Sequence, residues 1–278
     1  MRRLALALTA LGMLLHAPLV EAQSAASLTV PPTASWLPSL PVAVRTGVIE
    51  APDSIGSGWT RIRFVMDKQR HILVLLRLHD GTSAAAFLAA LDTARMTPST
   101  GLALGGPEVV LDGEVVLNLA PGRYVLTCMR RGADEKRHLG RGEFKVIVVA
   151  PKRATNRAAV KPPPASAELH MLDFAYRTPE RWRRGPQWVR VSNEGKEDHL
   201  VVIARLRNGA TLREWASAKV TDSVATPLTG VARMSTGGVM YLPLALSPGR
   251  YVLYCRVQHA SSGTLHEKLG MFKEITVE

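Results

Sequence analysis

The sequence predicts an all-β protein built from two tandem Greek-key β-sandwiches, each with one short inserted helix. Three observations lead to this prediction. Short apolar stretches alternate with polar residues and end at turns that contain Gly, Pro or Asn. The second half of the chain repeats the pattern of the first. Each copy spans roughly a hundred residues, the usual size of a β-sandwich.

The repeat consists of three blocks that recur with matched residues. The first block begins with a histidine and ends at a turn, the second is a Pro-Gly-Arg-Tyr-Val-Leu strand that ends in a cysteine, and the third begins with a second histidine. The paired blocks are residues 71–81 and 199–209, 121–128 and 248–255, and 138–145 and 266–273. Self-similarity of this kind indicates tandem structural units.

Within the first copy, alternation predicts strands, and an alanine-rich stretch after Thr82 and Ser83 predicts a helix over residues 83–94. The expected strands are residues 59–65, 72–78, 114–119, 123–128 and 142–149. In the second copy the corresponding helix is expected over residues 212–219. The tyrosines of the repeated strand, Tyr124 and Tyr251, are expected to pack in the core and at a corner.

Composition divides the chain into five segments. They are a signal peptide (1–22), a Ser-, Ala- and Pro-rich linker or early edge strand (23–42), a first domain (43–150), a basic Pro-rich linker (151–165) and a second domain (166–278). The chain opens with two arginines, an apolar run to Val20 and a small-residue cleavage site at Ala22, which is typical of a secretory signal peptide. We therefore expect a periplasmic or secreted protein, and no further stretch is apolar for long enough to span a bilayer.

The chain is strongly basic, with 35 Lys and Arg against 23 Asp and Glu and a net charge of +12. Few aromatic residues and the expected export argue against nucleic acid as a partner. An acidic redox partner or an anionic cell-envelope surface fits this charge better, and both contacts would weaken with salt. General basicity without a dedicated partner is the alternative interpretation.

Two cysteines, Cys128 and Cys255, are too few for a disulfide framework. They either pair with one another or remain free for a chemical reason. Motifs for acid–base or nucleophilic catalysis are missing: the sequence has no nucleophile elbow, no P-loop and no His-Glu-x-x-His motif. We therefore expect a protein that is not an enzyme.

The repeated blocks resemble the cupredoxins, the plastocyanin-like blue-copper family. Residues 189–195 before His199 resemble the family's strand and Asn/Gly approach to its first histidine. Residues 248–255 resemble its turn and penultimate strand, and residues 266–271 resemble its His-to-Gly-Met segment. The resemblance implies a copper site in the second copy with His199, Cys255, His266 and Met271 as ligands. Thiolate, imidazole and thioether are ligands that copper prefers.

Ten residues separate Cys255 from His266, whereas His259 lies nearer to Cys255 but farther from Met271. Either histidine is therefore a candidate for the second imidazole. In the first copy His71, Cys128 and His138 persist, but Glu143 stands where the second copy has Met271, and four Lys or Arg residues lie between Cys128 and His138. We expect this copy to be degenerate and structural.

Two functions follow from these patterns. The first is an exported copper protein for electron transfer or copper handling, with one copper in the second copy. The alternative is a metal-free pair of sandwiches that acts as a binding module in the cell envelope.

Overall fold

The computed structural model describes residues 35–67, 71–108, 112–134, 136–152, 160–219 and 221–278. The predicted signal peptide and residues 23–34 of the predicted linker lie outside these residues. Within them, no helix is long and apolar enough to cross a membrane.

The N-terminal half forms a sandwich of two sheets. One layer contains β1 (Ser39–Arg45), β2 (Val48–Glu50), β4 (Gly58–Met66) and β7 (Asp112–Leu119). The other layer has the order β3-β9-β8-β5-β6 and comprises β3 (Ser54–Gly56), β9 (Phe144–Ala150), β8 (Gly122–Cys128), β5 (Leu73–Leu78) and β6 (Gly101–Ala103). Residues 39–42, predicted as linker or early strand, belong to β1, which pairs in parallel with β4.

The C-terminal half repeats this arrangement. Its first layer contains β10 (Ala167–Leu172), β11 (Ala175–Arg177), β13 (Gly185–Asn193) and β16 (Val239–Leu246). Its second layer has the order β12-β18-β17-β14-β15 and comprises β12 (Arg181–Trp182), β18 (Phe272–Val277), β17 (Gly249–Tyr254), β14 (His199–Leu206) and β15 (Ala225–Met234). β5, β8 and β9 thus correspond to β14, β17 and β18, and the predicted fold class of two tandem cupredoxin-like sandwiches is confirmed.

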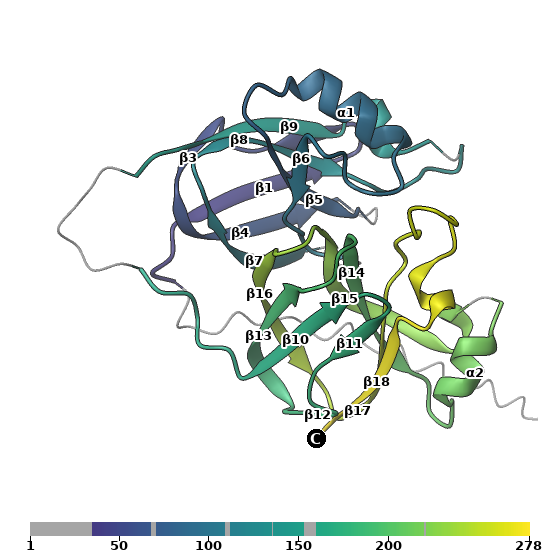
Figure 1. Ribbon diagram of the computed structural model, residues 1–278. Coiled ribbons are helices and arrows are strands. Elements are labelled where there is room, and N and C mark those ends of the chain that lie inside the picture. The colour runs from purple at the N-terminus through teal and green to yellow at the C-terminus, as the bar shows by residue number, and fades with distance from the viewer. Residues whose placement is uncertain (1–34, 68–70, 109–111, 135, 153–159, 220) are drawn as a thin grey trace, which may run out of the picture.

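One short helix covers the outer face of the second layer in each half (Figure 1). In α1 (Ala84–Thr93), capped by Ser83, the buried side chains Phe87, Leu88 and Leu91 pack against β5 and β8. In α2 (Leu212–Ser217), Thr211 and Glu214 form a capping box, and Trp215 packs on Tyr254 and Phe272 with ring centroids 5.0 and 5.4 Å apart. Both predicted helices are therefore present.

The repeated Tyr residues brace the strand that leads to each cysteine. Tyr124 Oη donates a hydrogen bond to the backbone oxygen of Ala120 (2.7 Å), and Tyr251 Oη donates to that of Ser247 (2.8 Å). This is the corner arrangement that fixes the entrance to a strand in many β-sandwiches. It orients β8 and β17 as they run to Cys128 and Cys255.

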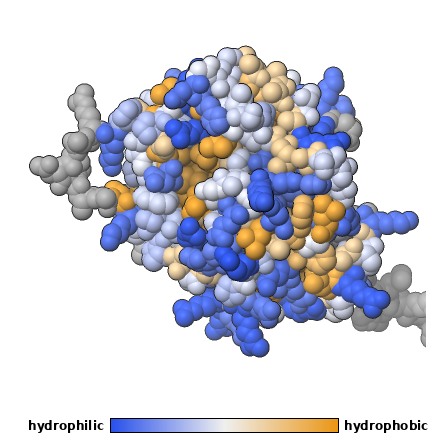
Figure 2. Space-filling model, in the orientation of Figure 1, coloured by the Kyte–Doolittle hydropathy of each residue, from blue (hydrophilic) through white to orange (hydrophobic). Residues whose placement is uncertain are grey.

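The two halves share a sheet. β16 pairs with β7 through Met240–Leu117 and Tyr241–Val116, which joins the first layers into one eight-stranded sheet, and a single apolar core continues through both halves. Residues 103–108 of the N-terminal half also lie along β15, with backbone hydrogen bonds from Ser235 to Ala103 and from Ala232 to Gly106 (both 2.8 Å). The face drawn in Figure 2 is mostly hydrophilic, with smaller apolar groups between the polar residues.

Glu108 lies buried at the junction of the two halves, where its Oε2 has no hydrogen-bond partner and its backbone N–H donates to Gly230 (3.1 Å). Burial raises the pKa of Glu108 to about 7, although the positive charge of Arg256 opposes the shift. The folded state therefore binds this proton more tightly than the unfolded state does. The contribution of Glu108 to the free energy of unfolding is fully present below the unfolded-state pKa of 4.5. It is lost as the pH rises to about 7.

We expect Glu108→Gln to remove this pH dependence, which amounts to about 3 kcal/mol between pH 4.5 and 7 at about 1.4 kcal/mol per pKa unit. Guanidinium unfolding at a series of pH values measures it. The exposed Glu50→Gln serves as the control and should leave the slope unchanged. Equal slopes for wild type and Glu108→Gln would contradict the prediction.

Candidate metal centres

Each half presents a buried group of metal-ligating side chains at equivalent places. The first histidine precedes β5 by two residues (His71) or begins β14 (His199), and the cysteine ends β8 (Cys128) or directly follows β17 (Cys255). The second histidine begins a single 3-10 turn, η2 (His138–Arg141) or η4 (His266–Leu269). Glycines with φ of 92° and 100° end these turns, a conformation that side chains with a Cβ rarely adopt.

After the glycine that ends each 3-10 turn, the next residue is hydrogen-bonded through its backbone to the second histidine and to the cysteine. In the C-terminal half Met271 N donates to His266 O (2.9 Å), and Cys255 N donates to Met271 O (3.2 Å). In the N-terminal half Glu143 N donates to His138 O (3.3 Å), and Cys128 N donates to Glu143 O (3.1 Å). Glu143 therefore occupies the backbone position that Met271 occupies in the other half.

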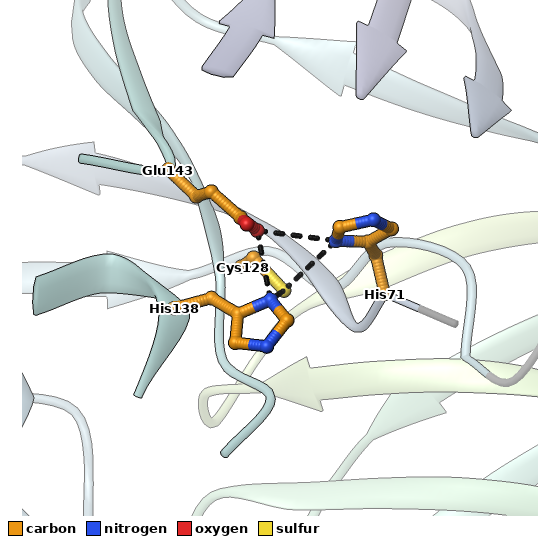
Figure 3. A group of neighbouring side chains, drawn as sticks. All are labelled: His71, Cys128, His138 and Glu143. Atoms are coloured by element: carbon orange, nitrogen blue, oxygen red, sulfur yellow. Dashed lines mark hydrogen bonds and ion pairs between the residues drawn. The ribbon is translucent and has the colours of Figure 1, made fainter. Parts of the chain in front are cut away.

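The N-terminal donor group comprises His71, Cys128, His138 and Glu143, all of them buried (Figure 3). Glu143 Oε2 lies 3.1 Å from His71 Nδ1 and 3.0 Å from His138 Nδ1. Cys128 Sγ lies 3.6 and 3.7 Å from the same two nitrogen atoms. Four potential ligand atoms, two nitrogens, a sulfur and an oxygen, therefore converge on one point.

The spacing of these four atoms suits a metal ion. Bonds of about 2.1 Å to nitrogen or oxygen and about 2.3 Å to sulfur place tetrahedral ligand atoms roughly 3.3–3.6 Å apart. The observed separations of 3.0–3.7 Å surround this range. The outer nitrogen of His71, Nε2, lies 3.1 Å from Asp67 Oδ1, and such a carboxylate partner orients a ligating imidazole.

That the first copy is degenerate and structural stays a prediction, although its four potential ligands lie close together. The cations between Cys128 and His138 were expected to disfavour a bound ion. Arg137, however, is directed to the backbone oxygens of Leu91 and Ala94 at the end of α1. The sequence analysis noted Glu143 only at the position of Met271 and did not identify it as a potential ligand.

The C-terminal donor group comprises His199, Cys255 and His266, all of them buried. Met271, five residues after His266, is also buried. His266 Nδ1 lies 3.1 Å from His199 Nδ1 and 3.6 Å from Cys255 Sγ. Cys255 Sγ also accepts a hydrogen bond from the backbone N–H of Leu200 (3.4 Å). Of the two candidate imidazoles, the structure therefore places His266 with the cysteine.

Asp173 supports the first histidine of this group. Its Oδ1 lies 3.1 Å from His199 Nε2 and accepts hydrogen bonds from the backbone N–H groups of Lys196 and Glu197. A Cβ at Gly195 would stand 2.6 Å from His199 Nε2 and 2.5 Å from Asp173 Oδ1, so only glycine fits there. The Asn/Gly approach that the sequence analysis noted thus makes room for this contact.

Burial sets the protonation of both donor groups. It raises the pKa of Cys128 and of Cys255 to about 12, and both are free thiols that form no disulfide. Desolvation lowers the pKa of His199 and of His266, and the neighbouring His199 lowers that of His266 further. The imidazoles of His199 and His266 are therefore neutral at neutral pH, while a metal ion would have to displace the proton of either thiol.

His259 occupies a separate position on the surface side of His266. Its Nδ1 lies 2.6 Å from Glu197 Oε1, and Glu197 Oε2 lies 3.1 Å from His266 Nε2. Glu197, His259 and His266 thus form a second potential ligand group that shares an imidazole with the buried one. Neither Glu197 nor Asp173 carries a sequence signal, because each reaches its histidine from a distant part of the chain.

Comparison with solved structures finds copper proteins. A dithionite-reduced auracyanin from Roseiflexus castenholzii is 20% identical over 40% of this chain and 94% of its own, with a TM-score of 0.28. A multicopper oxidase is 12% identical over 90% of this chain and 92% of its own, with a TM-score of 0.25. A copper-containing nitrite reductase from Thermus scotoductus SA-01 is 12% identical over 86% of this chain and 61% of its own, with a TM-score of 0.23.

No protein-family model matches the chain, and no curated protein matches it. The cupredoxin-like class therefore rests on the strand order described above. The prediction that the protein is not an enzyme is wrong: the structures that span most of the chain include multicopper oxidases and a nitrite reductase, which are enzymes. Missing acid–base motifs do not exclude an enzyme of this class.

Proposed function

We propose that the protein binds copper in its C-terminal half through His199, Cys255, His266 and Met271, for electron transfer or copper handling. The observation that carries the proposal is the convergence of two imidazole Nδ1 atoms and one thiol sulfur in a buried space. Two histidines, a cysteine and a weak thioether form the ligand set of blue-copper sites. A donor set supplied wholly by protein and closed to solvent suits electron transfer.

A second candidate site is favoured by one specific observation in the N-terminal half. There Glu143 adds a fourth ligand atom close to both histidine nitrogens. Carboxylate oxygen is a harder ligand than thioether sulfur, so this group suits a divalent ion such as Cu²⁺ or Zn²⁺ better than Cu⁺. We infer that the two halves differ in the ions or oxidation states that they prefer.

The test is to add Cu²⁺ to the purified, reduced protein and to record the intense visible absorption of a copper–thiolate bond. We expect Cys255→Ser to lose the band of the C-terminal half and Cys128→Ser to lose that of the N-terminal half. His266→Ala should lose the C-terminal band, whereas His259→Ala should retain it. His170→Ala, a histidine in ion pairs with Glu168 and Glu194, is the matched control.

A wild-type protein without any such band, whose cysteines a thiol titration shows to be reduced, would overturn the proposal and favour the metal-free binding module.

The proposed location is the periplasm or the exterior of the cell, because the first 22 residues have the composition of a signal peptide. The intact mass of the exported protein measures this, and a mature chain that begins at Gln23 is expected. The net charge supports an acidic redox partner or an anionic surface as the docking target.

A further inference from the structure

The side chains of Glu197 and His259 lie between solvent and the buried C-terminal donor group. They are 19% and 27% exposed, whereas those of His199 and His266 are fully buried. Any ion that reaches the buried donors from this side meets Glu197 and His259 first. This position raises the question of what the two outer side chains do.

His266 presents one ring nitrogen to each side. Its Nδ1 faces His199 and Cys255, and its Nε2 faces Glu197 Oε2 at 3.1 Å. On the outer side, Glu197 Oε1 lies 2.6 Å from His259 Nδ1, but the two atoms are not aligned for a hydrogen bond. The potential ligand atoms of Glu197, His259 and His266 all lie within 4.8 Å of one another, which is close enough for small side-chain movements to bring them onto one cation.

The loop that carries His259 is well ordered by hydrogen bonds. His259 N donates to Thr264 O (2.8 Å), Gly263 N donates to His259 O (2.9 Å), and Ser261 Oγ lies 2.9 Å from His259 Nε2. A hydrogen bond at Nε2 fixes the ring and leaves Nδ1 toward Glu197, as outer partners of metal-ligating histidines do. The imidazole is therefore held in position before any ion arrives.

Phe174 completes the enclosure. Its ring packs edge-on against His266 and His259, with centroids 5.1 and 5.5 Å away. Among the described residues it is the one non-glycine residue with positive φ, at 61°. A left-handed backbone costs roughly 1–2 kcal/mol in such a residue, and strain of this kind concentrates at functional sites.

The N-terminal half offers an internal comparison. Its corresponding loop, residues 129–137, contains arginines and a lysine but no histidine, and Asp67 faces His71 rather than His138. No group of three potential ligands is found on the outer side of His138 among the described residues. Among the described residues, such an outer group is therefore present in the C-terminal half alone.

We propose that Glu197, His259 and His266 Nε2 form a second, outer site for a divalent transition-metal ion, which serves as the loading site for the buried donors. One carboxylate and two imidazoles suit Cu²⁺ or Zn²⁺. The ion exchanges its water ligands for the outer ligands and then passes to the buried thiol. The outer site stands on its own contacts, while its role in loading rests on the proposed function.

The first experiment tests the outer site in a protein that lacks both thiols. In a Cys128→Ser/Cys255→Ser background, Cu²⁺ binding is followed by calorimetry and by electron paramagnetic resonance. We expect a nitrogen- and oxygen-ligated Cu²⁺ whose affinity falls about 10- to 100-fold in both Glu197→Gln and His259→Gln. His170→Gln is the matched control and should leave the affinity unchanged. Unchanged affinity in both outer variants would overturn the proposal.

The second experiment tests loading in the protein with both cysteines. His259 does not belong to the buried group, so His259→Gln should reach the same final copper–thiolate absorption as wild type, at a rate reduced about 10-fold. Equal rates would overturn the loading role. If wild type shows no copper–thiolate band but the outer site binds Cu²⁺, the proposed function fails and the outer site stands. If the band forms but the outer variants bind Cu²⁺ as before, the outer site fails alone.

Discussion

A divalent metal ion at a thousandfold excess over its dissociation constant should raise the free energy of unfolding by about 4 kcal/mol for each occupied donor group. The reason is that the donors converge only in the folded chain: His71 and His138, or His199 and His266, lie 67 residues apart in sequence in each case. Zn²⁺ is the probe, because it does not oxidise the thiols. Guanidinium unfolding with and without Zn²⁺ measures the gain.

Cysteine variants assign this gain to the two halves. Cys255→Ser should lose the part from the buried C-terminal group and Cys128→Ser the part from the N-terminal group. The double variant should keep only the part from the outer group of Glu197, His259 and His266. The metal-free stability of each variant provides its own reference. A double variant that gains as much from Zn²⁺ as wild type would contradict metal binding at these two groups.

Replacing Asp198 by Ala should lower the free energy of unfolding by about 3–5 kcal/mol, the cost of leaving a buried charge unpaired. Asp198 Oδ2 accepts hydrogen bonds from Thr97 N (2.5 Å) and Thr97 Oγ1 (2.6 Å), and Oδ1 accepts one from Ser235 Oγ (2.8 Å). Its Oδ2 also lies 3.8 Å from Arg233 Nη1, and burial lowers the pKa of that guanidinium. The substitution therefore strands a buried cation at the junction of the two halves.

Denaturant unfolding measures this effect, with the exposed Asp80→Ala as the control, which should change stability by less than about 0.5 kcal/mol. The double variant Asp198→Ala/Arg233→Leu should recover part of the loss, because it removes the stranded charge. An Asp198→Ala protein as stable as wild type would show that this contact contributes nothing to the junction.

The strands that the sequence predicted are those in which apolar residues alternate or run together next to clear turns. The ends of β4, β5, β7, β8 and β9 lie within two residues of the expected ones. β6 was missed, because Gly101–Ala103 has only three residues and lies in a Gly- and Pro-containing region. Pro41 weakens the strand pattern at the start of β1, so the sequence alone predicts a linker or an edge strand for residues 39–42.

For the donor groups, sequence spacing identified the histidines and cysteines but not how they meet. Because ten residues separate Cys255 from His266, the sequence leaves two candidate imidazoles. The choice between them depends on how the loop folds back, where His266 N donates a hydrogen bond to Val257 O (2.8 Å). Glu143 was undervalued because its role depends on η2 and Gly142. That these groups bind copper remains a prediction, and so do the bounds of the five segments.

The β7–β16 pairing bears on whether either half can be used alone. Separation would leave both strands as unpaired sheet edges in the middle of an apolar core, and such edges recruit other chains. Neither half is thus a transferable module in the way that a domain on a flexible tether is. Anyone who wishes to study one donor group in isolation has to inactivate the other in the intact chain, because excising it would turn an interior strand into an aggregation site.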